Sequence, residues 1–455
     1  MKGKVIALAV AALASALTAA QAEDAVAPAK GNIVISKVYY SQSNTVNKTT
    51  GKTTAYTDGQ FIELYNNSDK AVDVKDLYVG LGDFTTYNAG GWTTDRLRGD
   101  EGITYAEGQS AHPGCTVLKQ IFKIKKSKVL APGETLLLVN SAIDHTAIVN
   151  TDETENPYEC DLTGADFEAK DLGSAKPKTN NDNVEEIENV YTYSANFTFI
   201  QIAQAGPSPI VLFTTEANIG ELETTTPFNN ATGLPTALIQ NSWVIDGVEL
   251  ESKAVHNSER KYLADEIDKG GQICTSRIGE RFMRKAASVT EDGRLILQDT
   301  DNSTEDFVSS LTIGPRAYTY DIELTTSTDK IENAEVGDEI DIEGVLADAS
   351  FTEVYGKGCL KYSSSDETVG TMDGSVLKIV GEGETTVTIS VESKYLNAES
   401  VTVSVKVEKA KPTNIETVES NDRAEKIYDL SGREVKNPKG GLYVVGGKLK
   451  YVSGK

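Results

Sequence analysis

The chain has 455 residues, a formal net charge of −24 and 39% hydrophobic residues. A charge of this size repels nucleic acids and anionic lipid headgroups, which argues against both as partners. The length allows two or three domains. Frequent glycine, more tyrosine than phenylalanine and short alternating apolar runs favour an all-β protein.

The N-terminus has the pattern of a cleaved signal peptide. Lys2 and Lys4 precede an apolar stretch over 5–20, and Ala20-Gln21-Ala22 provides a small-residue cleavage site. The stretch is short for a membrane span, and no later stretch approaches the roughly 20 apolar residues that a spanning helix needs. We therefore expect residues 1–22 to be removed on export. The mature chain would then be secreted or displayed at the outer-membrane surface, with a charge of −26.

Alternating apolar residues predict a first series of strands, at 32–40, 60–68, 71–81 and 128–140. In the second of these, Phe61, Glu63 and Tyr65 share one face, while Ile62 and Leu64 share the other. A turn-forming Asn-Asn-Ser-Asp sequence follows directly. The pattern is typical of a sheet with one face toward a core.

A second series of strands is predicted at 206–213, 242–250, 276–285 and 295–307. In this order the segments resemble the lamin-tail domain, an immunoglobulin-like β-sandwich of bacterial surface proteins. The whole of 31–315 resembles an uncharacterised Bacteroidetes surface family that elaborates this sandwich, and it carries no established function. The segment from about 150 to 193 is rich in polar residues and is predicted to be a mobile insertion loop.

A second unit is predicted over 320–409. The segments 334–344, 361–393 and 401–409 resemble the bacterial Ig-like group 2 domain, and Asp373-Gly374 suits a tight hairpin turn. The resemblance implies a second sandwich of normal size. The predicted fold is therefore a tandem of immunoglobulin-like β-sandwiches.

Residues 410–424 form a polar linker to a short β-rich tail over 425–455. The tail resembles the C-terminal sorting tail of Bacteroidetes proteins exported by the type IX secretion system. The matching residues are Asp429, Gly432, Arg433, Gly441, Tyr443 and Gly447. The resemblance implies that the export and sorting machinery is a partner, and it leaves open whether the tail is cleaved.

The four cysteines are Cys115, Cys160, Cys274 and Cys359. An even number in an exported chain permits disulfides, and four cysteines allow three pairings. Cys115 with Cys160 is the favoured pair because both lie in the same proposed domain. Free buried thiols are the alternative.

One acidic cluster is a candidate metal site. Asp299, Asp301 and Asp306 could supply the clustered oxygen ligands that Ca²⁺ prefers. However, Thr304 stands where an EF-hand loop needs glycine, and Ser310 stands where its bidentate glutamate should be. A turn capped by Asx side chains is the favoured alternative. No other cofactor is predicted.

No catalytic motif is recognisable in the sequence. His112, His145 and His256 have no metal-binding spacing, and we interpret them as loop or surface residues. For ligand binding, Tyr87 and Trp92 flank a glycine-rich loop and could stack on a sugar or contact a protein. The alternative is that Trp92 fixes its loop to the core.

These observations predict an exported, surface-displayed binding or adhesion protein without catalytic activity, whose ligand is a surface glycan or a protein. One alternative is an accessory subunit of an outer-membrane nutrient-uptake receptor. A second alternative is a hydrolase that uses a pair of carboxylates, which would face each other across a cleft.

Overall fold

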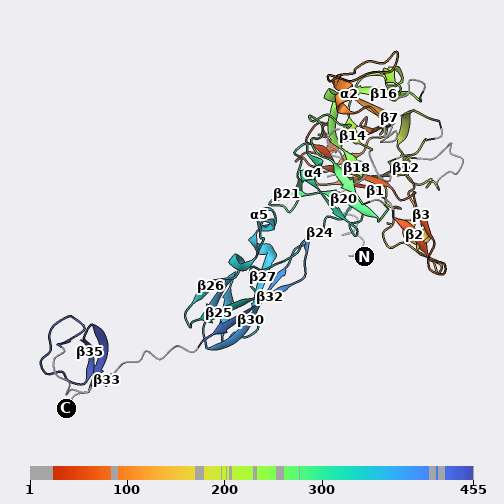
Figure 1. Ribbon diagram of the computed structural model, residues 1–455. Helices are drawn as coiled ribbons and strands as arrows, with labels where there is room; N and C mark the ends of the chain where they lie inside the picture. Colours follow the sequence, from red (N-terminus) through yellow and green to blue (C-terminus); the bar gives the residue numbers. More distant parts are fainter. Residues whose placement is uncertain are drawn as a thin grey trace, which may run out of the picture. The chain divides into compact units, whose positions relative to one another are not determined.

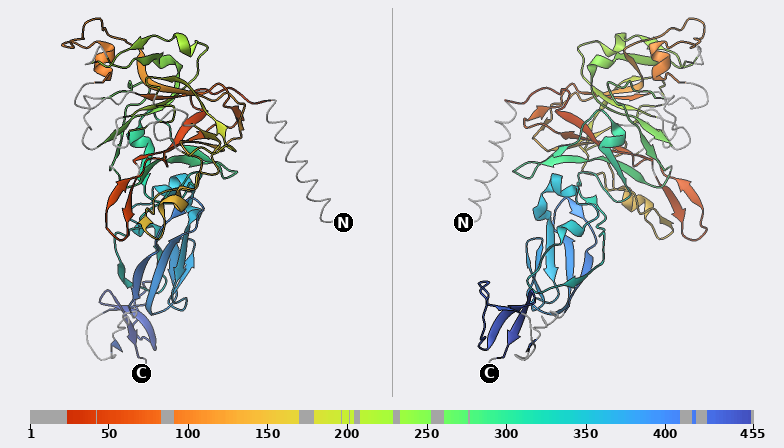
Figure 2. Two further views of the ribbon diagram at one scale, coloured as in Figure 1. Left: turned by 90° about the vertical axis from the view of Figure 1, so that its right-hand side faces the viewer. Right: turned by 60° about the vertical axis from the view of Figure 1, so that its left-hand side comes forward.

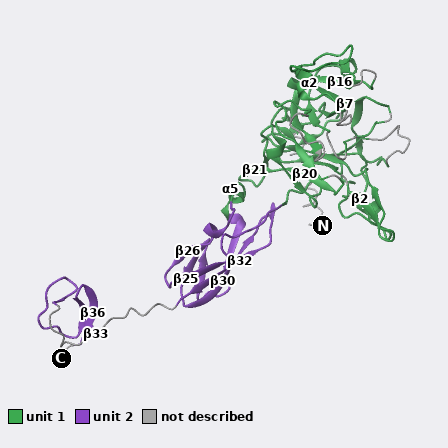
Figure 3. Cartoon of the chain, in the orientation of Figure 1, with its two compact units in different colours: residues 1–320, 350–357 green, residues 321–349, 358–455 purple. Residues whose placement is uncertain are grey.

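The computed structural model describes residues 24–41, 43–82, 91–169, 179–195, 197–200, 202–203, 208–228, 233–252, 261–275, 277–408, 417–418 and 426–453. The predicted signal peptide, Tyr87, His256 and most of the 410–424 linker lie outside these ranges. Strands dominate the described residues, so the predicted all-β, sandwich-type fold is confirmed. Contacts divide the chain into unit 1, residues 1–320 with 350–357, and unit 2, residues 321–349 with 358–455 (Figure 3). No described helix is long and apolar enough to span a membrane.

Two large sheets make up unit 1 (Figure 1). The first contains, in spatial order, β12 (Glu185–Glu186), β11 (Phe167–Glu168), β9 (Thr135–Val139), β4 (Phe61–Asn66), β1 (Ile33–Ser41), β20 (Glu280–Arg284) and β23 (Phe307–Ser310). The second contains β15 (Thr224–Thr225), β16 (Thr236–Gln240), β7 (Cys115–Lys123), β6 (Tyr78–Gly82), β14 (Ile210–Phe213) and β17 (Val244–Val248), with β13 (Glu188–Thr192) also paired to β7. We call them the β1 sheet and the β7 sheet.

The main core lies between the two sheets. Ile62 and Leu64 of β4 belong to this core, whereas Phe61 belongs to a second cluster on the opposite face, as the alternation predicts. Strand β1 pairs with β4 and, far along the sequence, with β20 (Figure 2). Its pairing with β4 shifts by one residue between Ile35 and Lys37, which is a β-bulge. Because of this bulge, Lys37 lies opposite Glu63 on the outer face.

The outer faces of both sheets are also covered. Ala142, Leu162 and Val184 pack on the outer face of the β1 sheet, and segments containing Ile219, Leu263 and Ile267 pack on that of the β7 sheet. Gly247 permits the second contact, because a Cβ atom there would lie 2.5 Å from the Ile267 side chain. Unit 1 is therefore thicker than a two-sheet sandwich.

The prediction of a polar insertion loop at 150–193 is wrong for the described part of that segment. Strands β11 and β12 extend the β1 sheet, and β13 pairs antiparallel with β7 in the other sheet. Strands β11 and β12 have two residues each and carry almost no alternation, and β13 lies in a polar stretch, so none of the three was predicted. The segment contributes to both sheets.

Short elements complete unit 1. The paired strands are β2 (Asn44–Asn47) with β3 (Thr53–Ala55) and β10 (Thr154–Glu155), β5 (Val72–Asp73) with β8 (Val129–Leu130), β18 (Leu250–Ser252) with β19 (Gln272–Cys274), and β21 (Ala286–Val289) with β22 (Leu295–Leu297). The helices are α2 (Thr94–Arg98), α3 (His145–Val149), η1 (Ile219–Glu221), η2 (Asn241–Trp243), α4 (Ser303–Asp306) and α5 (Phe351–Tyr355).

Unit 2 contains two smaller sheets. One has the order β25 (Lys330–Ala334), β32 (Val401–Val407), β30 (Gly383–Val391) and β27 (Leu360–Ser364), and the other has β26 (Glu339–Asp341), β29 (Val376–Ile379) and β28 (Gly370–Asp373). The remaining elements are β24 (Tyr320–Asp321), which pairs with β31 (Leu396–Asn397), and the single turns η4 (Glu343–Val345) and η5 (Lys357–Cys359). The predicted Asp373-Gly374 turn joins β28 to β29, with Gly374 at a φ of 62°.

The C-terminal segment forms a small separate sheet in the order β33 (Thr417–Val418), β36 (Lys448–Val452), β35 (Gly441–Val445) and β34 (Ile427–Tyr428). The hairpin between β35 and β36 turns at Gly446-Gly447, where both residues have positive φ angles. Glycine adopts such angles without steric cost.

A buried ion pair lies on the outer face of the β1 sheet. Lys37 Nζ is 2.6 Å from Glu63 Oε1, and both side chains are fully buried. The Tyr318 hydroxyl donates a hydrogen bond of 3.1 Å to the same carboxylate, and its ring lies 3.9 Å from Lys37 Nζ. Burial lowers the pKa of Lys37, and Glu63 opposes that shift. Through these two contacts, the pair fixes the segment around Tyr318 to the β1 sheet.

Replacing Lys37 with methionine should destabilise unit 1 by about 3–5 kcal/mol, because Glu63 would remain buried without its cation. Urea unfolding measures this loss. The matched control is Lys126→Met, which breaks an exposed pair with Glu185 and should cost less than about 1 kcal/mol. Equal losses for the two variants would contradict this interpretation.

Candidate functional site

Trp92 lies inside a small aromatic cluster near α2. Its side chain is 1% exposed, and its indole N–H donates a hydrogen bond of 2.7 Å to the carbonyl oxygen of Thr226. The rings of His112 and Phe228 meet it edge-on. The buried indole therefore has no free face for a ligand, and its place corresponds to the alternative in which it fixes the loop. Tyr87 lies outside the described residues.

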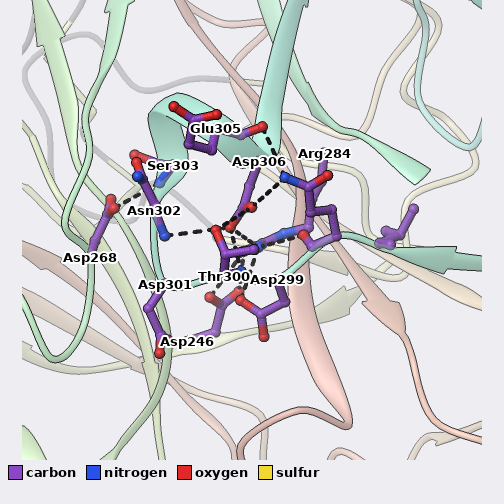
Figure 4. Close-up of polar contacts among 12 residues, drawn as sticks. Asp246, Asp268, Arg284, Asp299, Thr300, Asp301, Asn302, Ser303, Glu305 and Asp306 are labelled. Carbon is purple, nitrogen blue, oxygen red and sulfur yellow. Dashed lines mark hydrogen bonds and ion pairs between the residues drawn. The ribbon is translucent and has the colours of Figure 1, made fainter. Parts of the chain in front are cut away.

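The three aspartates considered as candidate Ca²⁺ ligands take part in ion pairs, and those of Asp299 and Asp306 with Arg284 are drawn in Figure 4. Arg284 Nη1 lies 3.1 Å from Asp299 and 3.3 Å from Asp306, while Asp301 pairs with Lys30 at 2.9 Å. Asp306 also accepts hydrogen bonds from the backbone N–H and hydroxyl of Thr300. The guanidinium thus supplies the positive charge that a metal would have brought. Within the described ranges, no group of three or more His, Cys, Asp or Glu residues is arranged to hold a metal ion.

Arg284 connects several distant segments. Its Nη2 atom is 3.0 Å from both carboxylate oxygens of Asp246 on β17, and its Nε donates to the carbonyl oxygen of Ile35 on β1. Asp246 in turn accepts a hydrogen bond of 2.6 Å from the backbone N–H of Ile35. Burial raises the pKa of Asp246 to about 7 against the opposing effect of Arg284. One feature of the sequence pointed to this network. Arg284 lies two residues after the core residue Phe282, so its side chain is expected on the same, inward face of the strand.

Two further buried carboxylates bind backbone N–H groups of the chain after β17. Glu249 accepts hydrogen bonds from the backbone N–H groups of Tyr262 and Leu263, and Asp268 accepts from those of Glu249 and Ser303. Both side chains are fully buried. Burial raises the pKa of Glu249 to about 8, and Lys261 opposes the shift. Perturbed carboxylates can mark a catalytic acid, but here the oxygens are bound by backbone amides.

The raised pKa of Glu249 makes stability depend on pH. Between the ordinary pKa of about 4.5 and the folded value of about 8, the folded state retains a proton that the unfolded state has lost, so stability falls as pH rises. The slope from this one group reaches about 1.4 kcal/mol per pH unit. The free energy of unfolding of wild type minus that of Glu249→Gln should therefore decrease from pH 5 to 8.

Chemical denaturation at several pH values measures this difference. The control is Glu185→Gln, which alters an exposed carboxylate and should give a nearly constant difference. A difference for Glu249→Gln that does not change with pH would contradict the shift.

None of the four cysteines, all of which lie in the described ranges, forms a disulfide bond. Cys115 packs against the aromatic cluster of Trp92, whereas Cys160 packs against the cluster of Tyr39 and lies 3.2 Å from Arg281 Nη2. The favoured Cys115–Cys160 pairing is therefore wrong, because the two thiols lie in different clusters. Nothing in the sequence indicates that these two cysteines lie in different clusters.

Two of the three histidines are described. His145 is fully buried, with Nδ1 2.6 Å from the Tyr56 hydroxyl and Nε2 2.8 Å from the carbonyl oxygen of Ser141. The prediction of a loop or surface residue is thus wrong for His145, which begins α3 and contacts the segment after β3. His112 contacts Trp92 in the aromatic cluster.

The tail residues have local structural roles. The Asp429 carboxylate accepts hydrogen bonds from the backbone N–H groups of Ser431 and Arg433, and the Ser431 hydroxyl holds the pKa of this carboxyl below its usual range. Gly432 has a φ of 82° in the same turn. Gly441 and Tyr443 lie on β35, where Tyr443 is opposite Lys450. Their role in sorting stays a prediction.

A polar groove of about 620 Å³ lies beside β13. We call it the β13 groove. Its lining includes Asp76, Tyr78, Lys123, Lys125, Glu188 and the segment 215–220. Lys123 Nζ is 2.8 Å from Asp76 Oδ1, and Lys125 forms an ion pair with Glu188. Lys123 and Glu188 become neighbours only because β13 pairs with β7, a pairing that the polar composition of this segment does not predict.

Residues 131–312 match the model of a family described as "Protein of unknown function (DUF4876)". The structure is similar to the crystal structure of a DUF4876 family protein from Bacteroides thetaiotaomicron VPI-5482, with 21% identity and a TM-score of 0.47 over 63% of this chain and 73% of that chain. A weaker similarity is to the S-layer protein rSbsC(31-844), with 12% identity and a TM-score of 0.15 over 94% of this chain and 62% of that chain.

Comparison with curated proteins gave no significant match. The matched residues run from the turn before β9 to the end of β23 and lie within unit 1. The sequence resemblance to an uncharacterised family over 31–315 agrees with this match at the level of the family. Residues 131–312 are thus similar to the DUF4876 family, and the match covers less than half of the chain.

Proposed function

We propose that the chain is exported and displayed at the outer-membrane surface as a binding or adhesion protein without catalytic activity. The signal-peptide pattern of residues 1–22 and the sorting-tail pattern from Asp429 to Gly447 support export. In this proposal the lamin-tail-like unit recognises a ligand and the Ig-like unit acts as a spacer. The tail is then the part read by the sorting machinery.

The β13 groove is the observation that carries the binding role. It is open on unit 1 and presents two cations, Lys123 at the end of β7 and Lys125 just after it. It also presents three carboxylates, those of Asp76 before β6, Glu188 on β13 and Glu216. Its volume of about 620 Å³ falls within the range of about 300–1,000 Å³ typical of ligand sites. Both lysines are paired with carboxylates of the groove, which suits recognition of a polar partner better than activation of a nucleophile.

Antibody labelling and cross-linking on intact cells test this proposal. We expect the antibody to label intact cells, and cross-linking with pull-down and mass spectrometry to recover a surface glycan or an external protein. Recovery should fall at least about tenfold in the groove variant, Asp76→Asn with Glu188→Gln. It should be unchanged in Glu384→Gln, which removes a carboxylate from an exposed pair in unit 2.

Two results would contradict the proposal. One is the absence of labelling on intact cells, and the other is equal recovery from the groove variant and the wild type. Groove-dependent recovery of an outer-membrane uptake receptor would instead support the role of an accessory subunit.

A further inference from the structure

We propose that the β13 groove binds a neutral saccharide, with the Asp76–Lys123 and Lys125–Glu188 pairs as its hydroxyl-recognising groups. This inference rests on the binding role proposed above and names the chemical class of the ligand. The pairing of the charges, their balance and the order of the surrounding chain support it.

Each charge pair presents a donor beside an acceptor. Lys123 Nζ and Asp76 Oδ1 are 2.8 Å apart, and Lys125 with Glu188 forms a second pair in the same groove. An ammonium group only donates hydrogen bonds, and a carboxylate only accepts them. A hydroxyl group does both. Adjacent hydroxyls of a sugar ring can therefore bind one such pair without leaving either charge unsatisfied.

The balance of charge disfavours an anionic ligand. Three carboxylates, those of Asp76, Glu188 and Glu216, face the groove beside only two ammonium groups. Among the residues that the structure describes, Glu216 forms no ion pair with a cation. The whole chain is also strongly acidic, at −24, which repels anions at long range. A neutral ligand has no such cost.

The groove is held in place before any ligand arrives. Lys123 lies 5.0 Å from the centroid of the Tyr78 ring, which stacks on Phe213 at 4.9 Å. The Asp76 pair holds the pKa of Lys123 above its usual range, so the ammonium form persists. The backbone N–H of Asp76 donates a hydrogen bond of 2.8 Å to the carbonyl oxygen of Ile124. A preorganised site loses less entropy on binding.

The segment 215–220, which also lines the groove, is ordered by its own side chains. The Asn218 amide oxygen accepts from the backbone N–H of Gly220 at 3.1 Å, and its amide nitrogen donates to Glu221 at 3.0 Å. The Thr215 hydroxyl accepts from the backbone N–H of Ala217 at 3.1 Å. These turns hold Glu216 at the groove, because the residues on both sides of it are fixed.

The test is binding of the purified mature chain to an array of neutral and anionic oligosaccharides, followed by calorimetry on those that bind. We expect binding to neutral members only. The dissociation constant should rise about ten- to hundredfold in the groove variant and stay within about twofold in Glu384→Gln. Asp76→Asn is suitable because asparagine tolerates the positive φ of 65° found at this residue. Thermal unfolding would verify that both variants fold.

Three outcomes would overturn the inference: no neutral saccharide binds, only anionic saccharides bind, or the groove variant binds as tightly as the wild type. Cell-surface labelling keeps this failure separate from that of the proposed function. A chain that labels intact cells and captures a groove-dependent protein, but binds no neutral saccharide, would retain the proposed function and lose only this inference.

Discussion

The structure of unit 1 depends on the coverage of both faces of both sheets. In an ordinary sandwich the outward side chains of each strand are solvated, and their charges need no partner. Here the outer positions are buried, so a charged residue there needs a counter-charge within the protein. Lys37 and Glu63 meet this condition across neighbouring strands. Arg284 lies at an inward position and also needs a counter-charge, which three aspartates from two other segments provide.

This constraint explains the distribution of carboxylates. Several carboxylates accept hydrogen bonds from backbone N–H groups. Those of Glu249 and Asp268 shape the turn after β17, and that of Asp429 shapes a turn in the tail. Such groups fix the path of irregular segments that no sheet hydrogen bond could direct. The β13 groove differs from them, because its charges lie at an open surface and are paired mainly with each other.

The sequence was sufficient for features set by local pattern. The alternation from Phe61 to Tyr65 predicted which side chains share a face of the sheet, and Asp373-Gly374 predicted a hairpin. The alternation did not indicate that both faces of this strand are buried. It was insufficient where an interaction joins distant segments. Asp299 and Asp306 suggested a metal site because Arg284, their partner, belongs to a different strand. The groove was missed for the same reason, since Lys123 and Glu188 become neighbours only when β13 pairs with β7.

The bulge in β1 has a consequence for how the gene can change. Ser36 is the extra residue that separates the alternation of Ile33 and Ile35 from that of Val38 and Tyr40, and its hydroxyl donates to the carbonyl oxygen of Glu63. Loss of this single codon would remove the bulge and keep the alternation, because Ile35 and Lys37 already lie opposite the consecutive residues Leu64 and Glu63. A codon gained elsewhere in β1 would instead reverse the orientation of part of the strand, directing either Lys37 or a run of apolar residues to the wrong side. Point substitutions in β1 can be compensated one at a time. A codon gained outside the bulge shifts every residue that follows it, so β1 should tolerate substitution, and loss of Ser36, better than insertion.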